Sequence, residues 1–260
     1  MNRPGWFAWF LTAVGVICMA VPLAVVVVSS FNDGTEIAVP PHGFSLRWYA
    51  NAFQRERFLH SLQFSLVLAA ISTALSLIIG LMCSVALMRH RFPGRELVAA
   101  LINSPLIVPQ VVMGMALLVL LANAGLASSF LGLGILHLIL TLPYTVKVLS
   151  ASLLRFPQSL EDAAIIHGAH PVTAFVRVTI PCVKPAMVAA AIFAFVTSFD
   201  NFTATQFLVW DRTTLPVEIY SYAMLETDPT VCAISAMLIA LTTVVVLAIE
   251  RWAGLEMVTG

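Results

Sequence analysis

Residues 159–181, SLEDAAIIHGAHPVTAFVRVTIP, form a polar stretch in a chain that is otherwise largely apolar. Ser159 stands three residues before Asp162, which is the spacing of a capping box at the start of a helix. Gly168 is expected to end this short helix or to permit close approach of another backbone, and Pro171 is expected to open a second helix. Spanning a bilayer requires no such segment, so we expect the stretch to be held by a partner protein.

The residues of this stretch distinguish two interpretations. A simple connector would lie on the membrane surface, where helices prefer basic residues on the polar face. Glu161 and Asp162 instead place negative charge in the first helical turn, where the helix dipole favours it. Ala163 and Ala164 then leave a small helix face, which favours docking into a groove of another protein over the surface connector.

The whole chain has 260 residues, of which 60% are hydrophobic and 10% are charged, whereas soluble domains carry about 25% charged residues. This composition predicts a membrane protein. The formal net charge is zero, which gives no basis for nucleic-acid binding. No metal site or disulfide is predicted, because the cysteines lack ligand spacing and lie in or beside apolar segments. These cysteines are Cys18, Cys83, Cys182 and Cys232.

Six apolar runs are long enough to cross a bilayer, which takes about 20 residues. The first run, from Trp6, is too long for the apolar core of a signal peptide, so we expect it to be retained. Prolines inside several runs favour a packed bundle, because neighbouring helices must satisfy the freed backbone groups. Pro181 and Pro185 are expected to break the chain before the fifth span. The sequence thus predicts an all-α membrane protein that forms one domain over residues 1–260. The predicted spans are approximately residues 6–30, 61–88, 98–122, 131–154, 185–207 and 230–251.

Basic residues set the predicted orientation, because cytoplasmic loops carry an excess of lysine and arginine. With the N-terminus inside, nine basic residues lie on the cytoplasmic side and four lie outside. Both termini and the loop at about 155–184 are then cytoplasmic. The outer stretch GFSLRWYANAF is expected to form an interfacial helix. The inner set is Arg3, Arg89, Arg91, Arg95, Lys147, Arg155, Arg177, Lys184 and Arg251, and the outer set is Arg47, Arg55, Arg57 and Arg212.

The polar stretch resembles the EAA loop in the permease subunits of bacterial ABC importers. That pattern runs Glu-Ala-Ala, three residues, Gly, nine residues, Ile, any residue, Leu-Pro. Here Asp162 stands in place of the glutamate, and Gly168 and Pro181 follow at the same spacing. The resemblance implies a cytoplasmic coupling helix between spans four and five that docks into an ATPase. The residues implied in this contact are Glu161, Asp162, Ala163, Ala164, Gly168 and Pro181.

Other stretches are similar to the spermidine/putrescine permease branch, namely VVVVSSFND, GFSLRWYANAF, NSPLIVPQVVMGMALL and TLPVEIYSY. The resemblance implies import of a small organic solute, with a polyamine preferred, across the bacterial inner membrane by alternating access. It implies an ABC ATPase dimer, a second permease subunit of different sequence and a periplasmic solute-binding protein as partners. Related permeases for γ-aminobutyrate, an aminophosphonate or another amine share these segments and remain an alternative.

The chain lacks the G-x-x-x-x-G-K-[ST] loop that binds nucleotide phosphates, and its only lysines are Lys147 and Lys184. ATP and Mg are therefore expected on the partner ATPase, and this chain is predicted to be neither an enzyme nor a cofactor carrier. A secondary transporter would need a coupling-ion site, and an inverted repeat would support it. A membrane enzyme would need a catalytic constellation. The sequence shows no coupling-ion site, no inverted repeat and no catalytic constellation, so neither alternative is favoured.

Asp200 and Asn201 lie in the predicted fifth span, in FAFVTSFDNFTATQF. A carboxylate inside a membrane is costly and usually faces a cavity or a partner. One interpretation places Asp200 on the solute path, where it attracts a cation while Asn201 and Thr203 add hydrogen bonds. The other makes Asp200 structural, paired with Lys147 or with backbone amides.

Six further positions carry polar groups of open role. Asn103 and Gln110 are seven residues apart, so one helix would present them on one face, either along the path or in helix–helix hydrogen bonds. His137, alone in the fourth span, is expected to be packed or to face the pore. The outer acids are expected to be solvated, with contact to a binding protein as the alternative. These acids are Glu218, Glu226 and Asp228.

Overall fold

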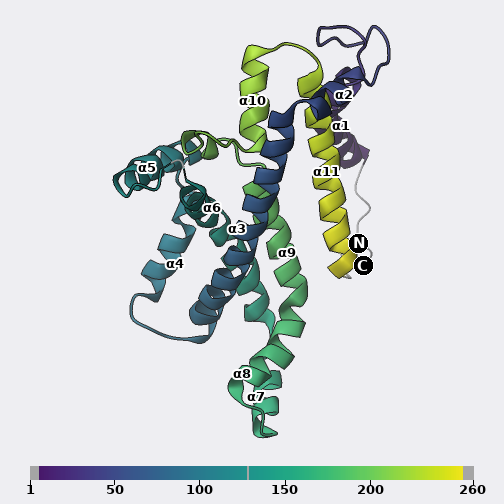
Figure 1. Ribbon diagram of the computed structural model, residues 1–260. Helices are drawn as coiled ribbons and strands as arrows, with labels where there is room; N and C mark the ends of the chain where they lie inside the picture. Colours follow the sequence, from purple (N-terminus) through teal and green to yellow (C-terminus); the bar gives the residue numbers. More distant parts are fainter. Residues whose placement is uncertain (1–5, 128, 254–260) are drawn as a thin grey trace. The chain divides into compact units, whose positions relative to one another are not determined.

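The computed structural model describes residues 6–127 and 129–253, and this part of the chain is almost entirely helical (Figure 1). Its only extended pairing among the described residues is an isolated bridge between Asn32 and Phe44. The all-α prediction is therefore confirmed. The α-helices are α1 (Trp6–Ser29), α2 (Arg47–Gln54), α3 (Glu56–Arg89), α4 (Arg95–Asn103), α5 (Gln110–Asn123), α6 (Phe130–Arg155), α7 (Ser159–Ile166), α8 (Pro171–Ala174), α9 (Ile180–Phe199), α10 (Leu215–Leu225) and α11 (Thr230–Ala253).

Five helical segments in the described ranges are long and apolar enough to cross a membrane, and a bent pair of helices would make a sixth span. This agrees with the predicted number of spans. The predicted helix in GFSLRWYANAF is also present, as α2. The five segments are Trp9–Ser29, Glu56–Arg89, Phe130–Arg155, Pro171–Phe199 and Thr230–Ala248.

The third span is not the continuous helix that the sequence predicted over residues 98–122. Helices α4 and α5 are bent by 109° at a break of a few residues, and a 3-10 turn over Ser104–Leu106 follows α4. Pro105 and Pro109 explain the break, because a proline has no N–H to continue the helix and constrains the residue before it. Pro109 itself is extended (φ −55°, ψ 133°) and precedes the first turn of α5.

The fifth span begins and ends earlier than the predicted residues 185–207. Pro181 and Pro185 do not break it, because the helical segment runs from Pro171 to Phe199. A π-helical turn over Phe175–Thr179 directly precedes Pro181. A π turn is wider than an α turn, which makes room for the proline ring. The expectation of a chain break before the span was therefore wrong.

The described residues form two compact units, one from 6–60 with 218–243 and the other from 61–127 and 129–217 with 244–253. The single-domain assignment over 1–260 stays a prediction. In the second unit, α6 packs against α9, and a buried apolar cluster joins α3, α5, α6 and the turn after α9. The cluster consists of Leu68, Leu117, Leu121, Leu133, Leu136, Leu140, Ala204 and Leu208.

In the first unit, polar contacts join the segment after α1 to α2. The indole Nε1 of Trp48 donates to the carbonyl oxygen of Asn32 at 2.7 Å. The hydroxyls of Ser30 and Tyr49 share a hydrogen bond of 2.6 Å. These bonds fix α2 on the end of α1 within this unit.

Candidate functional site

The polar stretch forms helix α7, but its first turn differs from the predicted capping box. The helix cap is Gln158, and no side chain caps the helix there. Ser159 already lies inside the helix, because Gln158 has helical angles (φ −60°, ψ −25°) and its carbonyl accepts from the N–H groups of Glu161 and Asp162. The capping-box prediction was therefore wrong, whereas the position of the helix was right.

Gly168 ends α7 as predicted. Its φ of +92° lies in the left-handed region, which glycine adopts without the steric cost of a Cβ. The N–H of Gly168 donates to Ile165 O at 2.9 Å, and the N–H of Ala169 donates to Ala164 O at 3.0 Å. This pair of bonds is a Schellman motif, which satisfies carbonyls at a helix end. A Cβ at Gly168 would have no neighbour within 4 Å, so only the backbone demands glycine.

Helix α7 divides the predicted coupling residues between two sides. Asp162, Ala163 and Gly168 are exposed, as is Pro181 at the start of α9, whereas Ala164 is half-buried. Glu161 is turned inward, and its carboxylate contacts Arg89 on α3. Large apolar side chains accompany the exposed set, namely Leu160, Ile166 and Val172.

Three of the residues predicted for the solute path, Asp200, Asn201 and Thr203, follow α9 instead of lying within a span. Helix α9 ends at Phe199, with Asp200 as its C-cap. The side-chain oxygen of Asn201 accepts from the N–H groups of Ala204 and Thr205, both at 3.3 Å. Asparagine side chains that bond the backbone in this way compete with helix formation, which explains why the helix stops here.

Asp200 and Asn201 therefore have different environments. Asp200 is exposed, and within the described part of the chain its carboxylate pairs with no basic residue, Lys147 included. The predicted ion pair with Lys147 is absent there. Asn201 is buried, and Thr203 lies half-buried in the turn that follows.

Asn201 belongs to a chain of hydrogen bonds that is buried except at Gln110, which is exposed. Its Nδ2 donates to Gln110 Oε1 at 3.0 Å, and its Oδ1 accepts from the Thr205 hydroxyl at 2.9 Å. His137 Nε2 lies 3.1 Å from that hydroxyl, and His137 Nδ1 lies 2.7 Å from Ser198 Oγ. Since the Thr205 proton is given to Asn201, His137 Nε2–H donates to Thr205. The neutral imidazole then accepts from Ser198 at Nδ1, so the network joins α5, α6, the end of α9 and the turn after it.

Asn103 and Gln110 do not share a helix face, contrary to the prediction. Asn103 ends α4, and its Nδ2 donates to Ala99 O within the same helix at 2.7 Å. Gln110 begins α5 on the far side of the break. The structure brings Gln110 to Asn201 instead, and sequence spacing gave no sign of this contact.

His137 was predicted to be packed or to face the pore, and the structure buries its side chain within the protein.

We expect Asn201→Ala to lower the free energy of unfolding by about 1–3 kcal/mol, because it leaves buried partners of the amide unsatisfied. Thr203→Ala, in the same turn, is the matched control and should cost less than about 0.5 kcal/mol. The measurement is denaturant unfolding of both variants in mixed micelles. Equal stability of the two variants would contradict a structural role for the network.

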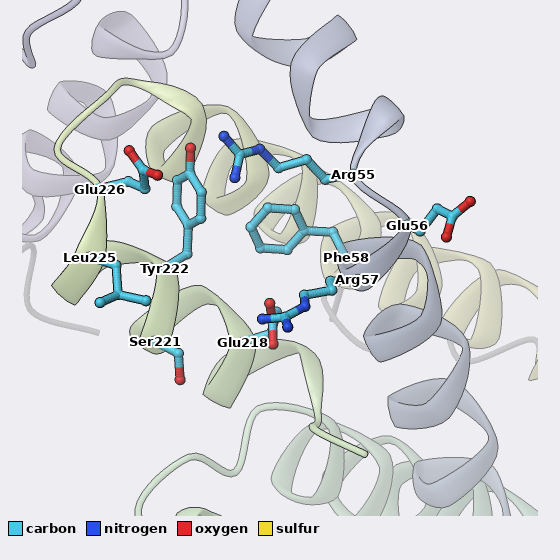
Figure 2. A pocket seen from close by; sticks show the side chains of 9 residues that line it. All are labelled: Arg55, Glu56, Arg57, Phe58, Glu218, Ser221, Tyr222, Leu225 and Glu226. Carbon is cyan, nitrogen blue, oxygen red and sulfur yellow. The ribbon is translucent and has the colours of Figure 1, made fainter. Parts of the chain in front are cut away.

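A separate cleft of about 430 Å³ lies in the first unit (Figure 2). The rings of Tyr222 and Phe58 meet edge to face at 5.3 Å, and the Arg55 guanidinium lies 4.5 Å from the centre of the Tyr222 ring. Burial raises the pKa of the Tyr222 phenol, so it stays protonated at neutral pH and donates to Asp228 Oδ2 at 2.9 Å. Glu218 and Glu226 line the same cleft. Asp228 is thus a structural acceptor and not simply a solvated charge.

These features define the class of the protein as a multi-pass helical membrane protein with a polar helical loop between two spans. The family described as "binding-protein-dependent transport system inner membrane component" matches residues 76–254, and the chain belongs to this family. It is thus an inner-membrane permease of the ABC importer class.

Two relatives and one solved structure illustrate the similarity. The chain is 29% identical to the spermidine/putrescine transport system permease protein PotC of Escherichia coli (strain K12), over 92% of this chain and 90% of the relative. It is 28% identical to the putrescine transport system permease protein PotI of the same strain, over 86% and 83%. A bacterial ABC transporter involved in alginate import has the same fold, with a TM-score of 0.72, 15% identity and 97% and 99% coverage.

Proposed function

We propose that this chain is the permease subunit of an ATP-driven importer for a small cationic organic solute, and that the solute is a polyamine. The observation that carries this proposal is the similarity to two polyamine permeases along most of each chain. The exposed carboxylate of Asp200 is chemically suited to an ammonium group. In this account Asp200 is on the solute path, whereas Asn201 and Gln110 position the turn that presents it.

The loop around α7 is proposed to dock into one subunit of an ABC ATPase dimer, which binds ATP and Mg. Support comes from its exposed apolar residues, Leu160, Ile166 and Val172, beside the exposed Asp162 and Ala163. The loop and both termini are then cytoplasmic. A periplasmic binding protein delivers the solute, and a second permease of different sequence completes the path. The chain itself hydrolyses no ATP.

Alternating access is the proposed mechanism. Nucleotide-driven closure of the ATPases moves the coupling helices, and the spans open outward to receive the solute. Hydrolysis then restores the inward-open state. Such a cycle requires that nucleotide binds the two states with different affinity.

A second candidate is the same class of importer with a different small solute. One observation favours it. Position 201 carries an amide that is held in a hydrogen-bond network, so the residue next to Asp200 supplies no second carboxylate for a second ammonium group. γ-Aminobutyrate or an aminophosphonate would then be the cargo.

Competition uptake separates the two candidates. Cells with and without this chain are given labelled putrescine, alone and with excess spermidine, γ-aminobutyrate or an aminophosphonate. Loss of putrescine uptake on deletion, together with competition by spermidine, supports the polyamine proposal. Intact putrescine uptake with loss of another solute's import would overturn the polyamine assignment and leave the importer class.

A further inference from the structure

Arg89, the last residue of α3, lies in a largely enclosed contact with the loop around α7. Its Nη1 donates to Glu161 Oε2 at 2.7 Å, and the two side chains are only 13% and 12% exposed. When two charges are shielded from water in this way, removal of one is strongly destabilising, because the other is left buried and unpaired. The contact therefore specifies how the end of α3 and the first turn of α7 are placed.

A third polar group and two aromatic rings enclose the pair. The Thr179 hydroxyl donates to the same Glu161 Oε2, and Arg89 Nη2 lies 3.4 Å from that hydroxyl. The Arg89 guanidinium carbon is 5.8 Å from the centre of the Phe156 ring and 5.6 Å from that of Phe175. Both distances are in the range of cation–π attraction. One arginine thus contacts the end of α6, the π turn and α7.

The chain joins α7 to the spans on both sides, to α6 through residues 156–158 and to α9 through α8 and the π turn (Figure 1). The bond from Glu161 to Arg89 adds a connection to α3. Glu161 and Asp162 are adjacent in the same turn, but Glu161 faces inward and Asp162 is exposed. A displacement applied to the exposed side of this turn therefore reaches α3 through one buried ion pair.

We infer that Arg89 is a positioning residue for energy coupling, which links the loop around α7 to α3 so that α3 and α9 move with it. This inference rests on the proposed docking of the loop to an ATPase. Arg89 itself touches neither solute nor nucleotide in this account. Its loss should uncouple ATP hydrolysis from transport instead of merely lowering the amount of complex.

The test uses the full complex of both permeases, the ATPases and the binding protein in proteoliposomes, with labelled putrescine as the probe. In Arg89→Gln we expect ATP hydrolysed per putrescine imported to rise about tenfold, within the usual range of coupling between sites. Hydrogen exchange of residues 159–168 should also become faster by about tenfold. The exchanged pair, Arg89→Glu with Glu161→Arg, should return both values toward those of the wild type.

Arg91→Gln is the matched control, because Arg91 is exposed and lies two residues further along the chain, in the loop after α3. Its coupling ratio and exchange should equal those of the wild type. An unchanged ratio in Arg89→Gln would overturn the inference, and so would hydrolysis and uptake that fall in step with the amount of assembled complex. If the wild type imports no putrescine, the polyamine proposal fails. Hydrogen exchange of residues 159–168 then tests the link between α7 and α3 by itself. Faster exchange in Arg89→Gln but not in Arg91→Gln supports the link, and unchanged exchange in Arg89→Gln overturns it.

Discussion

Replacement of Gly168 by valine should lower ATP-dependent uptake by roughly 5- to 30-fold while the chain still inserts into the membrane. The φ of +92° at this position costs an L-residue roughly 1–2 kcal/mol, which corresponds to that factor in the population of the native helix end. A β-branched residue is among the least suited to these angles. No neighbouring atom is displaced, since a Cβ would meet nothing within 4 Å. Uptake and co-purification of the ATPase measure the effect.

A matched control separates loss of coupling from general backbone strain. Gly94 also has a positive φ, +80°, and equally empty surroundings, but it lies between α3 and α4. Gly94→Val should therefore cost similar local stability and leave ATPase docking intact. Gly168→Asn should be milder than valine, because asparagine tolerates left-handed angles. Normal complex assembly together with normal uptake in Gly168→Val would contradict the assignment of α7 as the coupling helix.

Asp200→Asn should raise the KM for a cationic solute by about fivefold to tenfold, because it removes an exposed negative charge. At about 4 Å, two unit charges interact by about 1 kcal/mol in water and by about 4 kcal/mol near a protein surface. Assembly should not change, since the carboxylate pairs with no basic residue in the described part of the chain. The measurement is initial uptake rate against putrescine concentration, with assembled complex determined in parallel.

Asp211→Asn is the control for Asp200→Asn. Asp211 is also exposed, and the substitution removes the same charge eleven positions later, outside the turn that follows α9. It should change the KM by less than about twofold. If Asp200→Asn behaves like this control, Asp200 does not lie on the solute path.

Hydropathy predicted the number of spans and most of their positions, because an apolar run of sufficient length has few alternatives to a membrane helix. The break in the third span was not predictable at this level. The sequence contains Pro105 and Pro109 in the third apolar run, but the hydropathy of this run is the same whether its helix continues or bends by 109°. The direction after a proline depends on packing against other helices, which composition does not contain.

The candidate site was predicted unevenly. The end of α7 could be predicted from local chemistry, because helices commonly end at a residue with positive φ and glycine, here Gly168, adopts that conformation most readily. The C-terminal end of the fifth span could not, because the sequence presents Asn201 only as a polar residue within an apolar run, whereas its side chain bonds the backbone where the helix stops. Arg89 entered only as a cytoplasmic charge, because its partner Glu161 is 72 residues away. Such long-range pairs depend on how the helices pack, so no local pattern shows them.

The central claim is that this permease imports solute only when a partner ATPase acts on it. The most direct measurement is uptake of labelled putrescine into proteoliposomes that contain both permeases and the binding protein, with or without the ATPase and internal ATP. Uptake that requires both the ATPase and ATP is the predicted result. Uptake that proceeds without either one would contradict the account and identify the chain as a secondary transporter.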